Sequence, residues 1–189
     1  QVLTPTHRGD AGTRSLNFAL QAALNPPKPG KQERRFGELI FREGDRVMQT
    51  RNDYDVVWQK GDGTAGTGIF NGDVGKIAKI DPSGELLEIV FDDRTATYTS
   101  DMLAELDMAY AMTVHKAQGS EYRGVVFVGA PCAPSLMVRG VLYTAITRAR
   151  ELLVIVGDDS AVNKMAENDR RSRRYSGLKW RLRKGGEEK

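Results

Sequence analysis

The sequence predicts an α/β protein whose parallel sheet is interrupted by a small β barrel. Two apolar runs, at residues 125–129 and 152–157, are continuous rather than alternating, and each ends in glycine. Such runs are typical of parallel strands buried on both faces. Residues 37–106 instead alternate short β-rich runs with turn signals, which is typical of a small barrel. With 40% hydrophobic and 28% charged residues, the chain has the composition of a globular protein with a packed core.

Residues 1–36 are expected to begin the α/β domain. A short strand at 1–4 and a glycine-containing turn precede a helix, which Thr13 or Ser15 is expected to cap. The apolar positions of this helix follow helical spacing: Leu16, Leu20, Ala23 and Leu24. Three prolines within residues 26–29 must end the helix, because proline lacks an amide hydrogen and excludes helical geometry before it. This segment is predicted to be a linker.

Five short strands are expected within the barrel region: 38–41, 45–50, 73–80, 86–91 and 95–99. Residues 61–66 also match the G-x-G-x-x-G pattern of dinucleotide-binding loops. That pattern binds pyrophosphate only where it opens a helix, and the glycine-rich residues that follow cannot form one. A flexible hairpin tip is therefore favoured.

Residues 107–189 return to α/β character, with a helix expected from about 135 to 148 between the two apolar runs. Between Lys164 and Lys184 there are nine Lys or Arg and two acids. This segment carries +7, so the rest of the chain carries −4 of the total charge of +3. A phosphate-facing surface and a solvated helix end explain this basic tail equally well.

Several classes of protein are disfavoured. Cys132 is the only cysteine, so no intrachain disulfide can form, and a reducing, cytoplasmic compartment is expected. One cysteine and two distant histidines argue against a zinc site. No apolar run is long enough to span a bilayer, and no signal peptide is expected. Because the chain begins at Gln1 rather than Met, we expect a fragment of a longer protein. A Walker A loop is missing, since Lys31 and Lys76 are followed by neither Ser nor Thr.

Two blocks carry the most specific signal. Residues 109–122 read AYAMTVHKAQGSEY and follow the pattern T-x-H-x-A-[KQ]-G-x-E; residues 141–150 read VLYTAITRAR and contain Y-[TV]-[AG]-x-T-R-A. In this order and spacing they resemble motifs V and VI of superfamily 1 helicases, the relatives of UvrD and RecD. Residues 1–17 resemble the motif IV region of RecD-type enzymes, residues 44–54 and 70–75 their inserted SH3-like barrel, and residues 174–178 their C-terminal end.

The resemblance implies a RecA-like motor domain interrupted by an SH3-like barrel: residues 1–36 and 107–189 form the motor domain and 37–106 the barrel. It further implies ATP-driven 5′-to-3′ translocation on single-stranded DNA with duplex unwinding, in DNA repair or recombination. ATP and Mg²⁺ would be bound mainly by an N-terminal motor domain of the same parent chain. Subunits of a nuclease complex are further candidate partners, and no membrane partner is expected.

The resemblance also assigns nucleotide-binding residues. Arg148 matches the arginine finger of motif VI, whose planar guanidinium binds phosphate bidentately and never loses its charge. Arg150 is expected on the helix surface instead. Arg8 lies where motif IV places a second phosphate-sensing arginine. Gln118, Gly119 and Glu121 are expected to face the nucleotide, with Glu121 accepting hydrogen bonds from ribose hydroxyls.

A second group is expected to face single-stranded DNA and to bind its phosphates: Thr4, Thr113, His115 and Lys116 from the motor domain, with Arg51, Asn52 and Asn71 from the barrel. Two alternatives remain open. The chain could be a non-catalytic nucleic-acid-binding module, in which the barrel and basic tail do the binding. It could also be the helicase part of a conjugative relaxase. Sequence upstream of Gln1 would separate the three.

Overall fold

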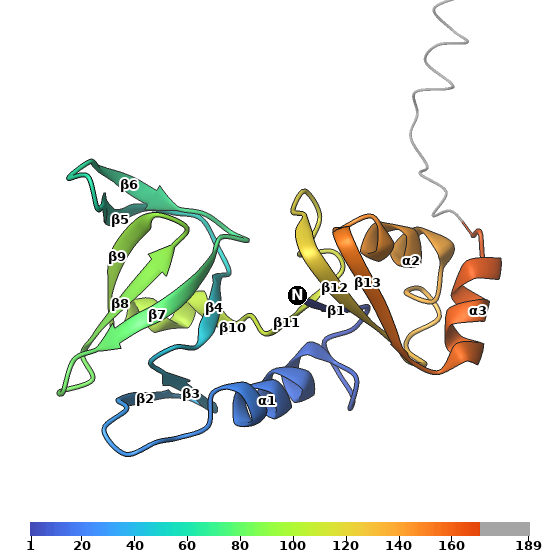
Figure 1. The fold of residues 1–189 in the computed structure, drawn as a ribbon, viewed down its shortest axis with the longest axis horizontal. Helices are drawn as coiled ribbons and strands as arrows, with labels where there is room; N and C mark the ends of the chain where they lie inside the picture. Colours follow the sequence, from blue (N-terminus) through green and yellow to red (C-terminus); the bar gives the residue numbers. More distant parts are fainter. Residues whose placement is uncertain (171–189) are drawn as a thin grey trace, which may run out of the picture.

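A parallel sheet and an antiparallel barrel lie side by side in residues 1–170, the part of the chain that the computed structural model describes (Figure 1). Most of the basic tail and the segment 174–178 lie outside the described residues. None of the helices within residues 1–170 is long and apolar enough to cross a membrane.

The parallel sheet has the strand order β11-β1-β12-β13. Its strands are β1 (Val2–Thr4), β11 (Ala111–Thr113), β12 (Tyr122–Gly129) and β13 (Ala149–Gly157). Helices α2 (Arg139–Ile146) and α3 (Asp159–Glu167) contact β12 and each other. The buried core between them includes Leu3, Phe127 and Met165. The predicted helix at 135–148 is thus confirmed, with narrower bounds.

The edge strand β13 departs from the prediction. β12 alternates fully buried with partly exposed residues, but Leu152, Val154, Ile155 and Val156 of β13 are all exposed. β13 pairs with β12 on one side, and no described element pairs with its other edge. Burial on both faces, which the continuous apolar run predicts, is therefore wrong for β13 within the described residues.

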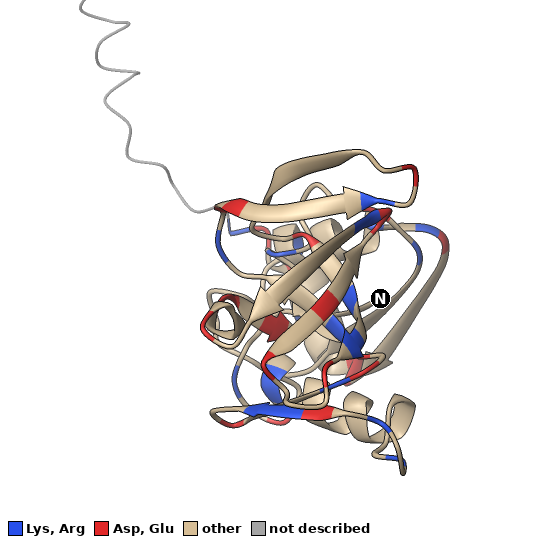
Figure 2. Cartoon of the chain, turned by 90° about the vertical axis from the view of Figure 1, so that its left-hand side faces the viewer, with Lys and Arg blue, Asp and Glu red and all other residues tan. Residues whose placement is uncertain are grey.

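The barrel is a seven-stranded antiparallel sheet in the order β10-β4-β7-β8-β9-β5-β6. Its strands are β4 (Arg46–Gln49), β5 (Asp53–Lys60), β6 (Ala65–Ile69), β7 (Val74–Ile80), β8 (Leu86–Phe91), β9 (Arg94–Thr99) and β10 (Leu106–Met108), and a 3-10 helix, Met102–Glu105, precedes β10. Fifteen buried side chains, among them Phe41, Phe91 and Tyr98, form its core. On its surface, acidic and basic residues are interspersed (Figure 2).

Two barrel elements differ from expectation. Residues 61–64 of the glycine-rich segment do form a hairpin tip, while Ala65 and Gly66 already belong to β6 and pair with β5. Neither of these strands was predicted, however. The strand expected at 38–41 is β3 (Leu39–Arg42), which pairs with β2 (Glu33–Phe36) in a separate hairpin. It is not part of the barrel sheet.

Helix α1 (Thr13–Leu24) is predicted correctly in position but not in its buried face. Its N-cap is Gly12, and no side chain caps its start. The expected apolar stripe lies partly in solvent, with Leu24 68% exposed. The buried side chains are polar and recur every four residues: Thr13, Asn17, Gln21 and then Asn25 beyond the helix.

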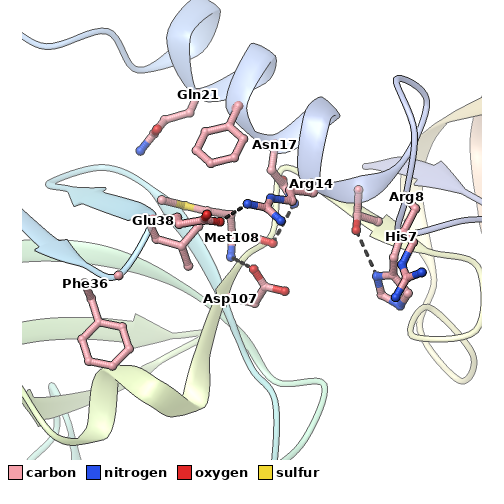
Figure 3. Close-up of a pocket in the computed structure, with 13 residues that line it drawn as sticks. His7, Arg8, Arg14, Asn17, Gln21, Phe36, Glu38, Asp107 and Met108 are labelled. Carbon is pink, nitrogen blue, oxygen red and sulfur yellow. Dashed lines mark hydrogen bonds and ion pairs between the residues drawn. The ribbon is translucent and has the colours of Figure 1, made fainter.

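These polar side chains bind the chain segments that connect the sheet to the barrel. The Asn17 amide donates to the Met108 carbonyl at 3.0 Å (Figure 3). It also donates to the Ala111 carbonyl at 3.0 Å and accepts from the Ala111 N–H at 2.8 Å. A buried backbone group without a partner costs about 1–3 kcal/mol. An amide is therefore favoured over leucine at this position, since it pairs with three such groups.

Asp45 fixes the start of the barrel in the same way. This wholly buried carboxylate accepts hydrogen bonds from the Gln21 amide and the Asn25 amide, both at 2.6 Å. It also accepts from the Tyr110 hydroxyl at 2.8 Å and the Arg42 N–H at 2.7 Å. α1, the β2–β3 hairpin, the barrel and the segment leading to β11 all meet at this residue.

Candidate functional site

The motif V segment, residues 114–121, starts at the carboxyl ends of β1 and β11 and ends at the amino end of β12. Val114 and Ala117 are buried and anchor it, and the Val114 N–H donates to the Thr4 carbonyl at 3.0 Å. Gly119 has φ of 86°, a left-handed conformation that favours glycine. The anchored residues leave His115, Gln118 and Glu121 exposed.

At the amino end of β13, Arg148 is held by hydrogen bonds to neutral acceptors. Its guanidinium donates to the carbonyls of Thr144 at 3.2 Å and Ser120 at 2.9 Å, and to the Thr147 hydroxyl at 3.2 Å. Among the described residues, no carboxylate lies within ion-pair distance of it. Arg148 therefore has a fixed direction and keeps its full charge.

Arg150 differs from Arg148 in this respect. Its Nε lies 2.7 Å from Glu121 Oε2, so the two exposed side chains form an ion pair. Glu121 was expected to accept hydrogen bonds from ribose, and one of its two carboxylate oxygens is thus already paired with Arg150. The structure brings Glu121, Arg148 and the Ser120 carbonyl together at one end of the sheet.

Arg8 lies elsewhere. It follows the carboxyl end of β1, whereas Arg148 precedes the amino end of β13, at the opposite end of the parallel sheet. Arg8 lines a hollow of about 530 Å³ together with His115, Lys116 and Asn71. The structure therefore places Arg8 with the residues assigned to DNA.

The DNA-facing group is brought together only in part. The side-chain hydroxyl of Thr4 donates to the Ala11 carbonyl at 2.6 Å, and Thr4 is wholly buried, so it has no side-chain surface to offer DNA. Thr113 is also buried, and its hydroxyl accepts from the Lys116 N–H at 3.3 Å. Thr113 thus shapes the turn that presents Lys116.

Barrel and motif V meet at Lys116. Its Nζ lies 2.5 Å from Asn71 Oδ1, and the Asn71 N–H donates to Asn52 Oδ1 at 3.0 Å. Arg51 points to a different partner, the buried carboxylate of Glu105, whose hydrogen bond and charge raise the pKa of Arg51. Lys116, Asn71 and Asn52 therefore form one connected group, and Arg51 is ion-paired beside it.

Two further residues close to this group were not singled out from the sequence. Asp107 lies in the barrel strand β10. Desolvation raises the pKa of its carboxyl, and the hydrogen bond from the Met108 N–H, with smaller contributions from His7 and Lys116, opposes that shift. Figure 3 shows Asp107 and His7 lining a cavity of about 520 Å³ between α1 and the β2–β3 hairpin. Asp107 lies outside the motifs, and His7, within the motif IV region, was assigned no role from the sequence.

Comparisons with known proteins agree with this arrangement. Residues 16–91 match the family described as the ATP-dependent RecD-like DNA helicase SH3 domain, and residues 108–156 match the UvrD-like helicase C-terminal domain. The chain is 38% identical over 173 residues to the ATP-dependent RecD2 DNA helicase of Deinococcus radiodurans, covering 92% of this chain and 22% of that protein. It is 32% identical to the RecBCD enzyme subunit RecD of Mycolicibacterium smegmatis, covering 98% of this chain and 30% of that protein.

The chain thus spans less than a third of the length of these curated relatives. Its fold is similar to that of Bacteroides Pif1 bound to ssDNA, with a TM-score of 0.54 at 17% identity, covering 98% of this chain and 45% of that one. A structure of Pif1 at forked dsDNA gives a TM-score of 0.52 at 18% identity, covering 98% of this chain and 44% of that one. The parallel sheet with its helices is therefore a RecA-like domain, and the barrel is its SH3-like insert. On its motifs, its matched domains and its relatives, the chain belongs to the RecD-like family of superfamily 1 helicases.

Proposed function

We propose that this chain forms the second motor domain, with its inserted barrel, of an ATP-dependent helicase that translocates on single-stranded DNA and unwinds duplex. The name of the Deinococcus radiodurans relative, an ATP-dependent DNA helicase, supports this assignment. In the proposal, a first motor domain of the same protein binds ATP and Mg²⁺, and this chain completes the site across a cleft. The resemblance to RecD-type enzymes implies 5′-to-3′ movement.

The observation that carries the proposal is the environment of Arg148. Phosphoryl transfer is catalysed mainly by positioning and by neutralising the charge that spreads over the γ-phosphate oxygens. A guanidinium has five N–H donors. Three hydrogen bonds to neutral acceptors orient that of Arg148 and leave donors for a phosphate. Gln118 and Glu121 are exposed, and in the proposal they contact the rest of the nucleotide.

Translocation requires a grip on DNA that changes when the cleft closes. The motif V segment connects the two ends of the sheet: His115 and Lys116 lie at the hollow near Asn71, and Ser120 accepts from Arg148. A movement of Arg148 toward a phosphate would therefore be transmitted through a few residues to the DNA-facing group. This arrangement supports a motor rather than a non-catalytic binding module. A binding module would not require an arginine that is held in one direction without an acidic partner.

The test is substitution of Arg148 in the full-length helicase. Arg148→Ala should leave ATP binding intact and slow DNA-stimulated hydrolysis by about a thousandfold or more, the effect of losing an arginine finger. Arg148→Lys should restore little, because an ammonium cannot reproduce the bidentate fork. Arg150→Ala is the matched control and should hydrolyse ATP within a few-fold of wild type. Near-wild-type turnover by Arg148→Ala would reject the assignment and move the role to Arg150 or Arg8.

A second measurement uses the chain as it is. The sequence contains no Walker A loop to cradle phosphates, so the isolated chain should show no DNA-stimulated ATPase activity. Clear turnover by the purified chain would contradict the proposed division of labour between two motor domains. Association with nuclease subunits is a further proposal; it rests on relatives that are named as RecBCD subunits. Co-purification of the full-length protein with such subunits would test it.

A further inference from the structure

Two aromatic side chains on the barrel surface have no role in its core. Tyr54 of β5 is 66% exposed and Phe70, directly after β6, is 40% exposed. Their rings form an edge-to-face pair with centroids 5.6 Å apart and an interplanar angle of 71°. In an edge-to-face pair, the ring that contributes its edge leaves both of its own faces uncovered by the partner ring. Exposed aromatic rings in contact with each other are typical of binding surfaces.

The turn that carries Phe70 holds the ring in place. Gly68 has φ of 98°, and a Cβ atom there would lie 2.9 Å from the Phe70 ring, so glycine leaves room for it. The Phe70 N–H donates to Asp73 at 3.1 Å, and Asp73 is ion-paired with Arg94 at 3.2 Å. The pair is thus presented by a constrained turn, which lowers the entropy cost of binding a ligand.

The same turn contacts the cationic hollow of the motor domain. Asn71 follows Phe70 in the chain and accepts from Lys116 Nζ at 2.5 Å. Asn52, which bonds the Asn71 N–H, also approaches the Tyr54 hydroxyl at 3.5 Å. The ring pair and Lys116 are therefore joined by two side chains, and Arg8 and His115 line the same hollow as Asn71 and Lys116.

Aromatic rings beside the charged side chains of Lys116 and Arg8 suit one class of ligand. In single-stranded nucleic acid, the face of an unpaired base can stack on an aromatic ring. The phosphates on either side of that base can bind cationic side chains. An apolar protein segment would use the rings but not the cations, and a folded duplex does not expose base faces. The observations therefore favour a single strand.

We propose that Tyr54 and Phe70 form a stacking platform for one unpaired base, whose neighbouring phosphates contact Lys116 and His115. Tyr54, the more exposed ring, provides the larger share of the surface. Because every base has an aromatic face, the platform tolerates any sequence. This inference rests on the proposed function, and it assigns the barrel a direct part in holding DNA.

The experiment measures DNA binding by the 189-residue chain, using fluorescence anisotropy with a labelled strand of about twenty nucleotides, longer than the ~4–16 nucleotides that small barrels cover. Tyr54→Leu and Phe70→Leu keep an apolar side chain and remove the ring. The matched control is Val57→Ala, which changes another exposed apolar residue of β5. Circular dichroism of each variant checks that the fold is retained.

Tyr54→Leu should bind about five- to a hundredfold more weakly than wild type, the range that base–aromatic stacking supplies, and Phe70→Leu should show a smaller loss. Val57→Ala should bind as wild type does. The salt dependence should be unchanged in the ring variants, because they remove no phosphate contact. Lys116→Ala should instead make the slope of log affinity against log salt shallower by about 0.7.

A strand of equal length without bases separates stacking from other effects. Wild type should bind it about as weakly as Tyr54→Leu binds the normal strand, and Tyr54→Leu should lose nothing further on it. Equal losses on both strands would reject stacking. If Lys116→Ala changes the salt slope while both ring variants bind like Val57→Ala, the platform is wrong and the DNA interface stands. If wild type binds no strand even at low salt, the DNA contacts of the proposed function fail with it.

Discussion

Arg148 and Arg150 are two residues apart, and the structure gives them different environments. The proposed function makes Arg148 the arginine finger, and its hydrogen bonds to neutral acceptors are an observation that the sequence cannot contain. Arg150 is ion-paired with Glu121. The sequence also could not show that Thr4 is buried or that Arg8 lies beside Lys116, because a motif fixes the identity of a residue but not the direction of its side chain.

Asp107 makes a prediction about pH. Desolvation raises the pKa of its carboxyl, so the folded protein holds this proton more tightly than the unfolded chain does. The contribution of Asp107 to the free energy of unfolding should therefore fall as pH rises from about 4, the usual pKa, through the raised value. Asp107→Asn removes this titration. The difference in unfolding free energy between wild type and the variant, measured in urea across this range, should shift in favour of the variant.

Asp101→Asn provides a control with the opposite sign. A hydrogen bond from Thr99 lowers the pKa of Asp101, so its contribution is present above the usual pKa and is lost as pH falls through the lowered one. Parallel pH profiles for wild type and both variants would contradict these assignments.

Among the elements, the barrel strands β7, β8 and β9 were predictable because each is a short β-rich run and turn signals separate them. β5 and β6 were missed because the glycines between them read as a turn and β6 itself, AGTGI, has few strand-forming side chains. Pairing with β9 and with each other holds them in the sheet. That contact is tertiary, so no local pattern reveals it.

Two glycines of the barrel should respond differently to alanine. A Cβ atom on Gly75 in β7 would lie 2.7 Å from Ile89 Cγ2 and 2.8 Å from Phe91 Cδ1, both wholly buried. Gly75→Ala should lower the free energy of unfolding by about 1–3 kcal/mol, the usual cost of overpacking a core. Gly61→Ala has open space around it and should stay within about 0.5 kcal/mol of wild type. Urea denaturation measures both, and equal effects would contradict the packing of β7 against β8.

For the whole molecule, the order of the parts was predictable and the way they are joined was not. Motifs V and VI indicated the motor domain, and the β-rich residues 37–106 indicated the inserted barrel. Asn17, Gln21 and Asp45 join these parts through buried hydrogen bonds. A search for apolar periodicity cannot find this connection, because the buried face of α1 is polar and the leucines of the helix are partly exposed to solvent.

Removing Asp45 should weaken the whole chain. Asp45→Ala leaves the donors of Gln21, Asn25, Tyr110 and the Arg42 N–H buried without their acceptor, each at a cost of about 1–3 kcal/mol before relaxation. We expect a loss of at least about 3 kcal/mol in the free energy of unfolding. The exposed Asp55→Ala should stay within about 0.5 kcal/mol of wild type. Similar midpoints for the two variants in urea would show that Asp45 does not hold the parts together.

The joint at α1 also has a mechanical consequence. The barrel enters the fold beside Asp45 and leaves it beside Met108, and α1 bonds the chain at both points. Because α1 holds the barrel at both of its connections to the parallel sheet, the barrel should not turn independently of that sheet. In the cleft closure that the proposed function requires, the barrel should therefore rotate together with the parallel sheet as one rigid body. The β6–β7 turn, which carries Phe70, lies at the end of the barrel that faces the parallel sheet (Figure 1). Because the neighbouring Asn71 contacts Lys116, such a rotation should move Phe70 and Lys116 together.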